Sequence, residues 1–163
     1  MIAVVQRVTH ASVTVEAEGS RAAIGPGLCV LLGIEQGDDD ADAEWMAGKL
    51  ARLRIFRDDD DKMNRSVQDI GGEVLVVSQF TLAGDCSKGN RPSFIAAASP
   101  DLGRRLYEEV ASLLRTKHNL PAKTGSFGAM MKVELLNDGP VTLIVRSGGR
   151  SLGDQPQPAS PDG

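Results

Sequence analysis

Aromatic residues are scarce in this chain of 163 residues, which has four Phe, one Trp and one Tyr. The core must therefore rest mainly on Val, Ile and Leu, and a hydrophobic fraction of 41% excludes wholesale disorder. No apolar run approaches the roughly 20 residues that a membrane-spanning helix needs. The N-terminus also lacks the basic and apolar regions of a signal peptide. We therefore expect a cytoplasmic protein with no membrane attachment.

Side chains that bind metals or act as strong nucleophiles are also few. Cys29 and Cys86 cannot build a disulfide framework, and neither has a second cysteine at ligand spacing. His10 and His118 are the only histidines, and no Gly-rich nucleotide-binding motif occurs. The acidic run at residues 58–61 lacks the Gly and Glu that a calcium loop requires, so a solvated turn is the better interpretation. We expect no metal and no cofactor.

Negative charge is in modest excess, because 22 acidic residues face 18 basic ones and give a net charge of −4. This balance argues against binding along a long nucleic acid, which needs many phosphate contacts. It does not exclude gripping one end of an RNA. Nine acids gather at residues 38–44 and 58–61, so 22 − 9 = 13 acids remain against 18 bases elsewhere.

The order of expected elements indicates the fold class. Apolar and β-branched runs predict strands at residues 2–8, 12–16, 21–24, 28–34, 73–80, 130–136 and 141–145. One helix is expected after Gly37, with a buried stripe of Trp45, Met46, Leu50 and Leu53. A second helix begins at Ser99-Pro100, where Ser is the N-cap and Pro stands in the first turn.

Two helices cannot cover both faces of a large open parallel sheet. The pattern therefore predicts an α/β protein with a strongly curved, barrel-like mixed β-sheet flanked by two helices. Residues 1–147 are expected to form a single catalytic domain. Residues 148–163 are rich in Gly, Ser, Pro, Asp and Gln, which predicts a flexible C-terminal tail.

Two short segments place polar side chains at the end of a strand or in a turn. In Ser78-Gln79-Phe80-Thr81-Leu82, polar residues stand at the end of a buried strand, where backbone N–H groups lose their ladder partners and can face a ligand. A strand reaching the surface is the plainer explanation. In Asn137-Asp138-Gly139-Pro140-Val141-Thr142, residue types alone favour an ordinary hairpin turn. Proline is rare inside hairpins, however, and a Gly-Pro bond adopts the cis form at modest cost.

These segments, with others in the same order, resemble the D-aminoacyl-tRNA deacylases. The resemblance covers about residues 1–147 and includes Val5-Gln6-Arg7-Val8-Thr9, Ala11-Ser12-Val13, Ser78-Gln79-Phe80-Thr81-Leu82, Lys88-Gly89-Asn90-Arg91-Pro92, Phe94, Gly125, Phe127-Gly128-Ala129, Met131 and Asn137-Asp138-Gly139-Pro140-Val141-Thr142. Each block is weak by itself, and the ordered set is specific. The tail after Arg146 has no counterpart.

The resemblance implies a cytoplasmic homodimer that hydrolyses the ester between a D-amino acid and the 3′ end of its tRNA, and so keeps D-residues out of translation. It places the active site at the subunit interface. The pair matching Gly139-Pro140 is cis in the family and reaches into the partner's pocket, and Arg7 helps to orient that pair. Rejection of L-amino acids by this rigid main chain would leave glycyl-tRNA as an additional substrate, because glycine has no side chain to clash.

The same resemblance suggests roles for the site residues. We expect Thr81 to stabilise the oxyanion through its backbone N–H or its hydroxyl, together with the neighbouring amide of Phe80, while Ser78 and Gln79 orient the pocket or the substrate. A nucleophilic Thr81 is the alternative, although no base is visible beside it. Further substrate-binding positions are Phe127, Ala129, Met130 and Met131, for which plain core packing is the competing interpretation. Lys88 and Arg91 are candidates for phosphate contacts.

Two functions from other classes remain as alternatives. The chain could bind the end of an RNA without catalysis, in which case D-aminoacyl-tRNA would bind without turnover. It could also be a different ester hydrolase that uses Cys86 or Thr81. Loss of activity on thiol alkylation would favour the cysteine version.

Overall fold

A long first strand organises the sheet of this computed structural model, whose residues 1–148 are described here. β1 (Ile2–Val15) pairs antiparallel with β3 (Gly27–Gly33) through its first half and with β2 (Ser20–Ile24) through its second half. Along its other edge β1 pairs antiparallel with β8 (Lys132–Arg146) over nearly its whole length. The strands predicted at residues 2–8 and 12–16 are therefore one continuous element.

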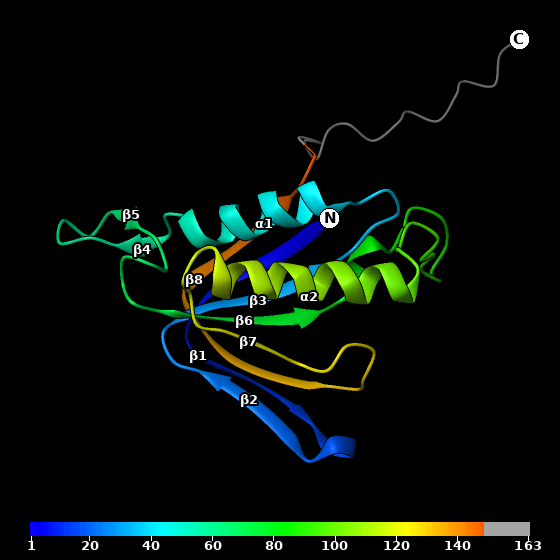
Figure 1. Cartoon of the computed structure of the whole chain (residues 1–163), viewed down its shortest axis with the longest axis horizontal. Coiled ribbons are helices and arrows are strands. Elements are labelled where there is room, and N and C mark those ends of the chain that lie inside the picture. Colours follow the sequence, from blue (N-terminus) through cyan, green and yellow to red (C-terminus); the bar gives the residue numbers. More distant parts are fainter. Residues whose placement is uncertain (149–163) are drawn as a thin grey trace, which may run out of the picture.

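The remaining strands of the sheet extend from β3. β6 (Glu73–Ser78) runs parallel to β3, and β7 (Ala122–Thr124) runs parallel to β6, which gives the order β2-β1-β3-β6-β7. The Lys123 side chain of β7 donates to the carbonyl oxygen of Ala23 on β2 at 2.6 Å. This contact joins the two ends of the path, so the sheet is nearly closed (Figure 1). The predicted barrel-like mixed sheet is confirmed.

Two helices lie side by side against the sheet, as Figure 1 shows. α1 (Asp40–Arg52) begins after Asp39, whose carboxylate accepts from the backbone N–H groups of Ala41 and Asp42. α2 (Pro100–Thr116) begins after Ser99, whose hydroxyl accepts from the Leu102 N–H. Both helix starts agree with the sequence, because an oxygen-bearing N-cap supplies an acceptor that the first turn lacks.

Short elements complete the fold. η1 (Glu16–Glu18) is a one-turn 3-10 helix between β1 and β2, and η2 (Phe80–Ala83) is another directly after β6. β4 (Phe56–Arg57) and β5 (Met63–Arg65) form a separate two-stranded hairpin. Its turn contains the acidic run, where Asp58 accepts from the N–H groups of Asp60 and Lys62, as expected for a solvated turn.

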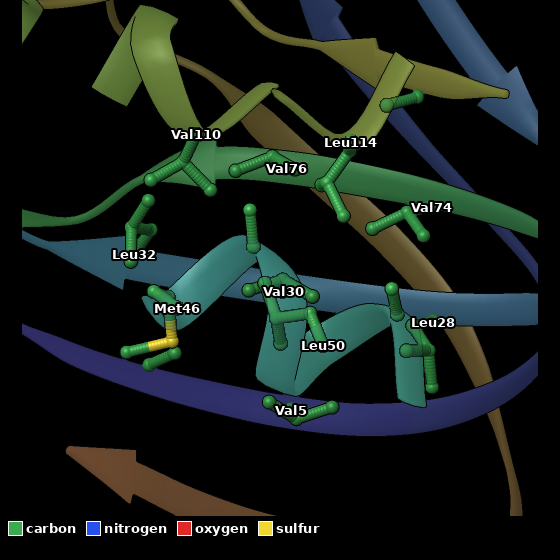
Figure 2. Close-up of a cluster of buried hydrophobic side chains, with 14 of the residues drawn as sticks. Val5, Leu28, Val30, Leu32, Met46, Leu50, Val74, Val76, Val110 and Leu114 are labelled. Carbon is green, nitrogen blue, oxygen red and sulfur yellow. The ribbon is translucent and has the colours of Figure 1, made fainter. Parts of the chain in front are cut away.

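The core has two layers, because neighbouring residues of a strand face opposite sides of the sheet. Leu28, Val30 and Leu32 of β3 pack toward the helices together with Met46 and Leu50 of α1 (Figure 2). Residues on the opposite face of the sheet point into the interior of the barrel. They form a second cluster, made of Val8, Ala11, Val13, Ile24, Cys29, Leu75 and Val77. Burial in this apolar cluster raises the pKa of the Cys29 thiol to about 11.

The stripe predicted for α1 is wrong at Trp45. Met46 and Leu50 are buried as expected, but Trp45 is 43% exposed. Alanines take the remaining inward positions of α1, at Ala43, Ala47 and Ala51. A small side chain lets the helix approach the sheet closely, so the large indole is left on the outer face.

The hairpin predicted at the C-terminal end of the domain is also wrong. Residues 132–146 form the single strand β8, which keeps one direction along β1. Val8 pairs with Asn137 and Gln6 pairs with Thr142, so residues 138–141 stand opposite Arg7 alone. These four residues form a wide bulge, which we call the β8 bulge. Proline cannot donate to a strand ladder, and a bulge is one of the few places where a strand tolerates it.

Neither helix among residues 1–148 is long and apolar enough to cross a membrane. The tail predicted at residues 148–163 lies outside the described residues apart from Gly148.

Candidate active site

Ser78 is the last residue of β6, and after it the chain turns directly into η2. The Gln79 N–H still donates to the carbonyl oxygen of Leu32 at 2.8 Å, which fixes the start of η2 against the end of β3. Gly33 permits this approach, since a Cβ there would lie 2.9 Å from the carbonyl oxygen of Gln79. The sequence predicted polar groups at a strand end, and the structure confirms that position.

The first turn of η2 presents main-chain donors. In a one-turn helix the first N–H groups have no acceptor within the turn, and here they belong to Phe80 and Thr81. The Thr81 side chain is exposed, and its hydroxyl accepts a short hydrogen bond from the Gln79 amide. This bond orients both polar side chains. It gives Thr81 no base, because an amide N–H cannot accept the proton that a nucleophilic hydroxyl must lose.

An aromatic pair stands beside these donors. The Phe80 ring is 59% exposed and meets Phe94 edge to face, with the ring centroids 5.2 Å apart. Gly84 allows the contact, because a Cβ there would lie 2.9 Å from the Phe94 ring. The next residue, Ile95, is 81% exposed. The donors of η2 are thus bordered by an open apolar surface.

The β8 bulge is held by the side chain of Asn137. The Val141 N–H donates to Asn137 Oδ1 at 2.8 Å, while Nδ2 donates to the carbonyl oxygen of Val141 and to the Thr142 hydroxyl. Gln6 Nε2 on β1 donates to that same hydroxyl at 3.3 Å. The side-chain amide of Asn137 therefore satisfies both the N–H and the carbonyl group of Val141 within the bulge.

Arg7 holds the bulge from beneath. Its side chain is only 4% exposed, and Nε donates to the carbonyl oxygen of Asp138 at 2.9 Å. Nη1 donates to the carbonyl oxygen of Ile55, at 2.6 Å. The Asp138 carboxylate lies 3.4 Å from Nε and is itself largely exposed. Arg7 thus joins two main-chain segments by hydrogen bonds that a lysine could not reproduce in the same plane.

The tip of the bulge is Gly139-Pro140, which the structure shows as a cis peptide, in agreement with the expectation. Gly139 has φ +134°, a conformation that L side chains rarely adopt. A Cβ at this position would lie 2.9 Å from the Arg7 guanidinium and 2.8 Å from the Val141 side chain. Only glycine fits between them, and both tip residues are exposed.

The two segments lie at different ends of the first half of β1. η2 packs beside Ile2 and Gly33, which are register partners, whereas the bulge stands opposite Arg7, the partner of Leu28. Arg7 is five positions beyond Ile2 along β1, which corresponds to about 17 Å at about 3.3 Å per residue. Within one chain the structure does not bring the two predicted halves of the site together.

The other predicted substrate-binding residues divide into buried and open positions. Phe127 packs on α2, with its ring centroid 5.8 Å from that of Tyr107, and the Arg104 guanidinium lies over the Phe127 ring, 5.1 Å from its centroid. Met131 packs on the cluster inside the barrel. Ala129 is half-buried, and Met130 is 92% exposed. Core packing therefore describes Phe127 and Met131, while Met130 is open to a ligand.

The residues of the rival hydrolase are dispersed. Cys86 is exposed in the loop after η2, and within residues 1–148 no hydrogen bond joins it to either histidine. Burial and the nearby charges of Arg52 and Lys117 lower the pKa of His118. In the described part of the chain no cluster of His, Cys, Asp and Glu could hold a metal ion.

Comparison with known proteins places the chain in a family. Over residues 4–146 the sequence matches the family described as D-Tyr-tRNA(Tyr) deacylase. The chain belongs to this family. The D-aminoacyl-tRNA deacylase of Heliobacterium modesticaldum is 61% identical over 150 residues, which cover 91% of this chain and 98% of that protein. The D-aminoacyl-tRNA deacylase of Geobacter sulfurreducens is 55% identical over 152 residues, with coverage of 93% and 98%.

Solved structures share the fold of this deacylase family member. A protein described as a c-Myc DNA unwinding element binding protein superposes with a TM-score of 0.83 at 45% identity, over 91% of this chain and 99% of that chain. A probable eukaryotic D-amino acid tRNA deacylase superposes with a TM-score of 0.74 at 18% identity, over 88% and 97% of the two chains. This second likeness concerns the fold alone.

Sequence reasoning about this deacylase missed two contacts. It did not find that Asn137 braces the bulge, although the spacing of Asn137, Pro140 and Thr142 in one short motif was visible. It also missed the carbonyl oxygen of Ile55 as a partner of Arg7, because a backbone acceptor leaves no trace in the sequence.

Proposed function

We propose that two copies of this chain assemble into a homodimer, in which each active site combines η2 of one copy with the β8 bulge of the other. The chain is a D-aminoacyl-tRNA deacylase, a hydrolase for the ester between a D-amino acid and tRNA. The proposal concerns how the site is built and how it distinguishes the two hands of an amino acid.

The observation that carries the proposal is the separation of about 17 Å between η2 and the bulge along β1. Donors for an oxyanion and carbonyl acceptors for an amino group must act on atoms of one aminoacyl ester, within a few ångströms of each other. One chain cannot supply both to a single ester. A second copy, related by a two-fold axis, can place its bulge over η2 of the first copy. By the same symmetry, the bulge of the first copy then lies over η2 of the second.

The outer surface of β8 supports such an assembly. β8 pairs only with β1 among the described strands, so its other edge is a long unpaired edge strand, which proteins rarely leave open. Exposed large hydrophobic residues lie on and next to this strand, on both of its faces: Met130, Val133, Leu136, Leu143 and Ile144. An apolar surface of this kind marks an interaction site.

The bulge suits the selection of D-amino acids. The carbonyl groups of Gly139 and Pro140 belong to a main chain that Arg7 and Asn137 hold in place. We infer that these carbonyls accept hydrogen bonds from the substrate's α-amino group and occupy the direction that an L side chain would take. A rigid wall rejects every L-residue by clash and accepts D side chains of any size, because these point away from it.

Hydrolysis then needs little more than charge stabilisation. The attacking water adds to the ester carbonyl carbon, the carbonyl oxygen becomes an oxyanion, and the ribose 3′-oxygen leaves with a proton. We assign the oxyanion to the N–H groups of Phe80 and Thr81, and one such donor is typically worth about 3 kcal/mol. The terminal ribose 2′-hydroxyl activates the water, while Ser78 and Gln79 orient the pocket.

The tRNA end itself would contact residues around this site. Met130, the most exposed of the predicted residues, is placed to pack on the terminal adenine, with Ala129 and Met131 behind it. Phe127 contributes from the layer beneath. Lys88 and Arg91 in the exposed loop after η2 would contact phosphates.

Hydrolysis assays with D-tyrosyl-, L-tyrosyl- and glycyl-tRNA test the chemistry. We expect rapid release of D-tyrosine, no release of L-tyrosine, and measurable release of glycine, which has no side chain to meet the wall. Complete resistance of glycyl-tRNA to hydrolysis would contradict the rejection of L-residues by clash with the main chain of the bulge. Binding of D-tyrosyl-tRNA without turnover would instead support the non-catalytic alternative.

Mixing two defective variants tests the shared site. Gly139→Val displaces the bulge, and Thr81→Pro removes a donor from η2, so each homodimer should be nearly inactive. After unfolding and refolding together, half of the dimers carry one copy of each variant, and one of their two sites is intact. Activity should therefore return to about a quarter of the wild-type value. A site built within one chain would show no such recovery.

A further inference from the structure

A basic pocket on α1 lies outside the site described above. It has a volume of about 260 Å³ and is lined by Trp45, Gly48, Lys49, Arg52, Leu53 and Arg54. We call it the α1 pocket. It lies where α1 ends and the chain turns toward β4, and the exposed indole of Trp45 forms one of its walls.

Every charged residue of the α1 pocket is positive. Among the described residues neither Lys49 nor Arg52 forms an ion pair. In this they resemble the loop cations Lys88 and Arg91 and differ from Lys117, which pairs with Glu44. The Lys49 ammonium instead lies 5.2 Å from the centroid of the Trp45 ring, and Arg54 donates to the backbone and side-chain oxygens of Asn64. In a protein of net charge −4, a pocket of three cations without a carboxylate is a local exception.

The residues of the pocket hold these cations near one another. A Cβ on Gly48 would lie 2.8 Å from Nη2 of Arg52, so the guanidinium rests against the bare backbone of the helix. The bonds to Asn64 fix Arg54, and the Trp45 ring supports Lys49. Guanidinium and ammonium groups gathered in this way bind the oxygens of a phosphate.

The α1 pocket is close to the β8 bulge. Arg54 precedes Ile55, whose carbonyl oxygen accepts from the same Arg7 that holds Asp138. Arg57, two residues further on, is near enough to Asp138 for that carboxylate to contribute to its raised pKa, although its main partner is Asp61. Figure 1 shows the end of α1, the β4–β5 hairpin and the middle of β8 at the same end of the molecule.

We propose that the α1 pocket binds phosphate groups of the tRNA substrate beyond its aminoacylated CCA end. This inference rests on the proposed function, in which the bulge of this copy meets an aminoacyl ester in the partner's site. An RNA whose 3′ end is held at the bulge extends from there over the adjoining surface, where the cations of the pocket lie. RNA is favoured over an acidic peptide because the substrate already brings phosphates to this place.

A structural role of the same residues must be separated from binding. Lys49 and Arg52 stand in the last turn of α1, where positive side chains also stabilise the helix dipole. Their loss would then lower thermal stability and affect every substrate equally. Binding of RNA beyond the CCA end would affect only substrates that contain it.

Steady-state kinetics on two substrates make this distinction. The variant Lys49→Gln/Arg52→Gln is compared with wild type on D-tyrosyl-tRNA and on a D-tyrosylated CCA trinucleotide. We expect KM for the tRNA to rise about threefold to tenfold with kcat unchanged, and both constants for the trinucleotide to stay the same. The dependence of log(kcat/KM) on log salt concentration should become shallower by about one for each lost phosphate contact.

Two control variants complete the test. Arg105→Gln/Lys117→Gln removes the same charge from exposed surface ion pairs and should leave KM for tRNA unchanged, whereas Arg52→Lys should retain most of the affinity. An unchanged KM for tRNA in the double variant, or an equal rise for both substrates, would overturn the inference while the proposed function stands. Failure of wild type to hydrolyse either substrate would count against the proposed function instead.

Discussion

Arg7 shows how one buried cation positions a loop of main chain. Its guanidinium donates to carbonyl oxygens of Asp138 and Ile55, which come from the bulge and from the segment before β4. A flexible side chain on the bulge could not provide an equally fixed surface. The selectivity that we propose therefore depends on main-chain atoms, and the side chains of Arg7 and Asn137 act through them as positioning residues.

Thr81 offers a test of how the oxyanion is stabilised. Thr81→Ala removes the hydroxyl and keeps the N–H, so kcat should fall by less than about tenfold. Thr81→Pro removes the N–H of the second residue of η2, which has no acceptor within the helix, and kcat should fall by about 100-fold to 1,000-fold. Single-turnover hydrolysis of D-tyrosyl-tRNA measures the decrease in rate for each of the two variants.

The opposite order would refute the assignment to the main chain. If Thr81→Ala abolished hydrolysis as completely as Thr81→Pro, the hydroxyl would be the reacting group. Circular dichroism of the two variants checks that η2 and the sheet are retained, since Gln79 also loses its hydroxyl partner in both.

At the scale of elements, β8 shows what a sequence pattern can and cannot predict. The cap Ser99 was predictable, because a single side chain satisfies an N–H group next to it, while the Asp-rich stretch after Gly37 predicted a helix start without singling out Asp39. The bulge was not predictable, since a proline and a glycine between two strand-like runs also describe a hairpin. What decides between them is the pairing of residues on both sides of the bulge with β1, which is non-local. The exposure of Trp45 likewise depends on how closely α1 approaches the sheet.

The brace formed by Asn137 leads to a prediction for β8. Asn137→Ala removes the acceptor of the Val141 N–H, and we expect the free energy of unfolding to fall by about 1 kcal/mol. The preference for D- over L-tyrosyl-tRNA should fall by a larger factor than kcat for the D-substrate, because the wall loses its position. Urea unfolding and paired hydrolysis assays measure these effects.

Two conservative variants sharpen that result. Asn137→Asp keeps an acceptor for Val141 N–H and should retain part of the discrimination, while Thr142→Val removes only the outer hydroxyl and should retain most of it. If all three variants discriminated between D- and L-tyrosyl-tRNA as well as wild type does, the brace formed by Asn137 would contribute to stability alone.

For the whole molecule, the sequence sufficed to predict the class of sheet, and the family resemblance indicated both segments of the site. The sequence could not show that η2 and the bulge lie apart on β1, because their separation follows from the register of β1 with β3. Oligomeric state is similarly absent from a pattern of single residues. The exposed apolar side chains of β8 become visible only once the strand pairs with β1 along one edge and, within residues 1–148, with no strand along the other.

The proposed dimer can be tested by placing a charge on the open edge strand β8. Ile144 is 54% exposed in the single chain, so Ile144→Glu should be harmless to a monomer. Burial between two copies would make the same charge costly, and we expect the variant to sediment as a monomer and to lose hydrolysis. Met63→Glu, at the same exposure of 54% on β5, is the matched control and should remain dimeric and active.

His118 predicts a pH dependence of folding stability. Its pKa is lowered from 6.5 by burial and by the charges of Arg52 and Lys117, against a smaller opposite effect of Glu44. The unfolded chain therefore binds a proton more readily than the folded one. The contribution of His118 to stability is greatest above pH 6.5 and declines as pH falls through 6.5 toward the lower folded value.

Urea unfolding of wild type and His118→Gln at pH 7.5 and pH 5.0 measures this contribution. Wild type should lose more stability than the variant between the two values, because glutamine does not titrate. An equal loss in both proteins would show that other groups account for the change. The difference between the proteins is the relevant quantity, since acids such as Glu73 with lowered pKa also contribute at low pH.

The β8 bulge has a consequence for the redesign of this enzyme. Leu136 and Leu143 keep their partners on β1 although four residues stand between Asn137 and Thr142 opposite a single one. Arg7 holds Asp138 and Asn137 holds Val141, so an insertion that keeps these two residues would be confined to the tip of the bulge. A combinatorial library that varies the length of this tip would move the peptide carbonyls to which we assign the selection, which libraries of side-chain substitutions cannot achieve.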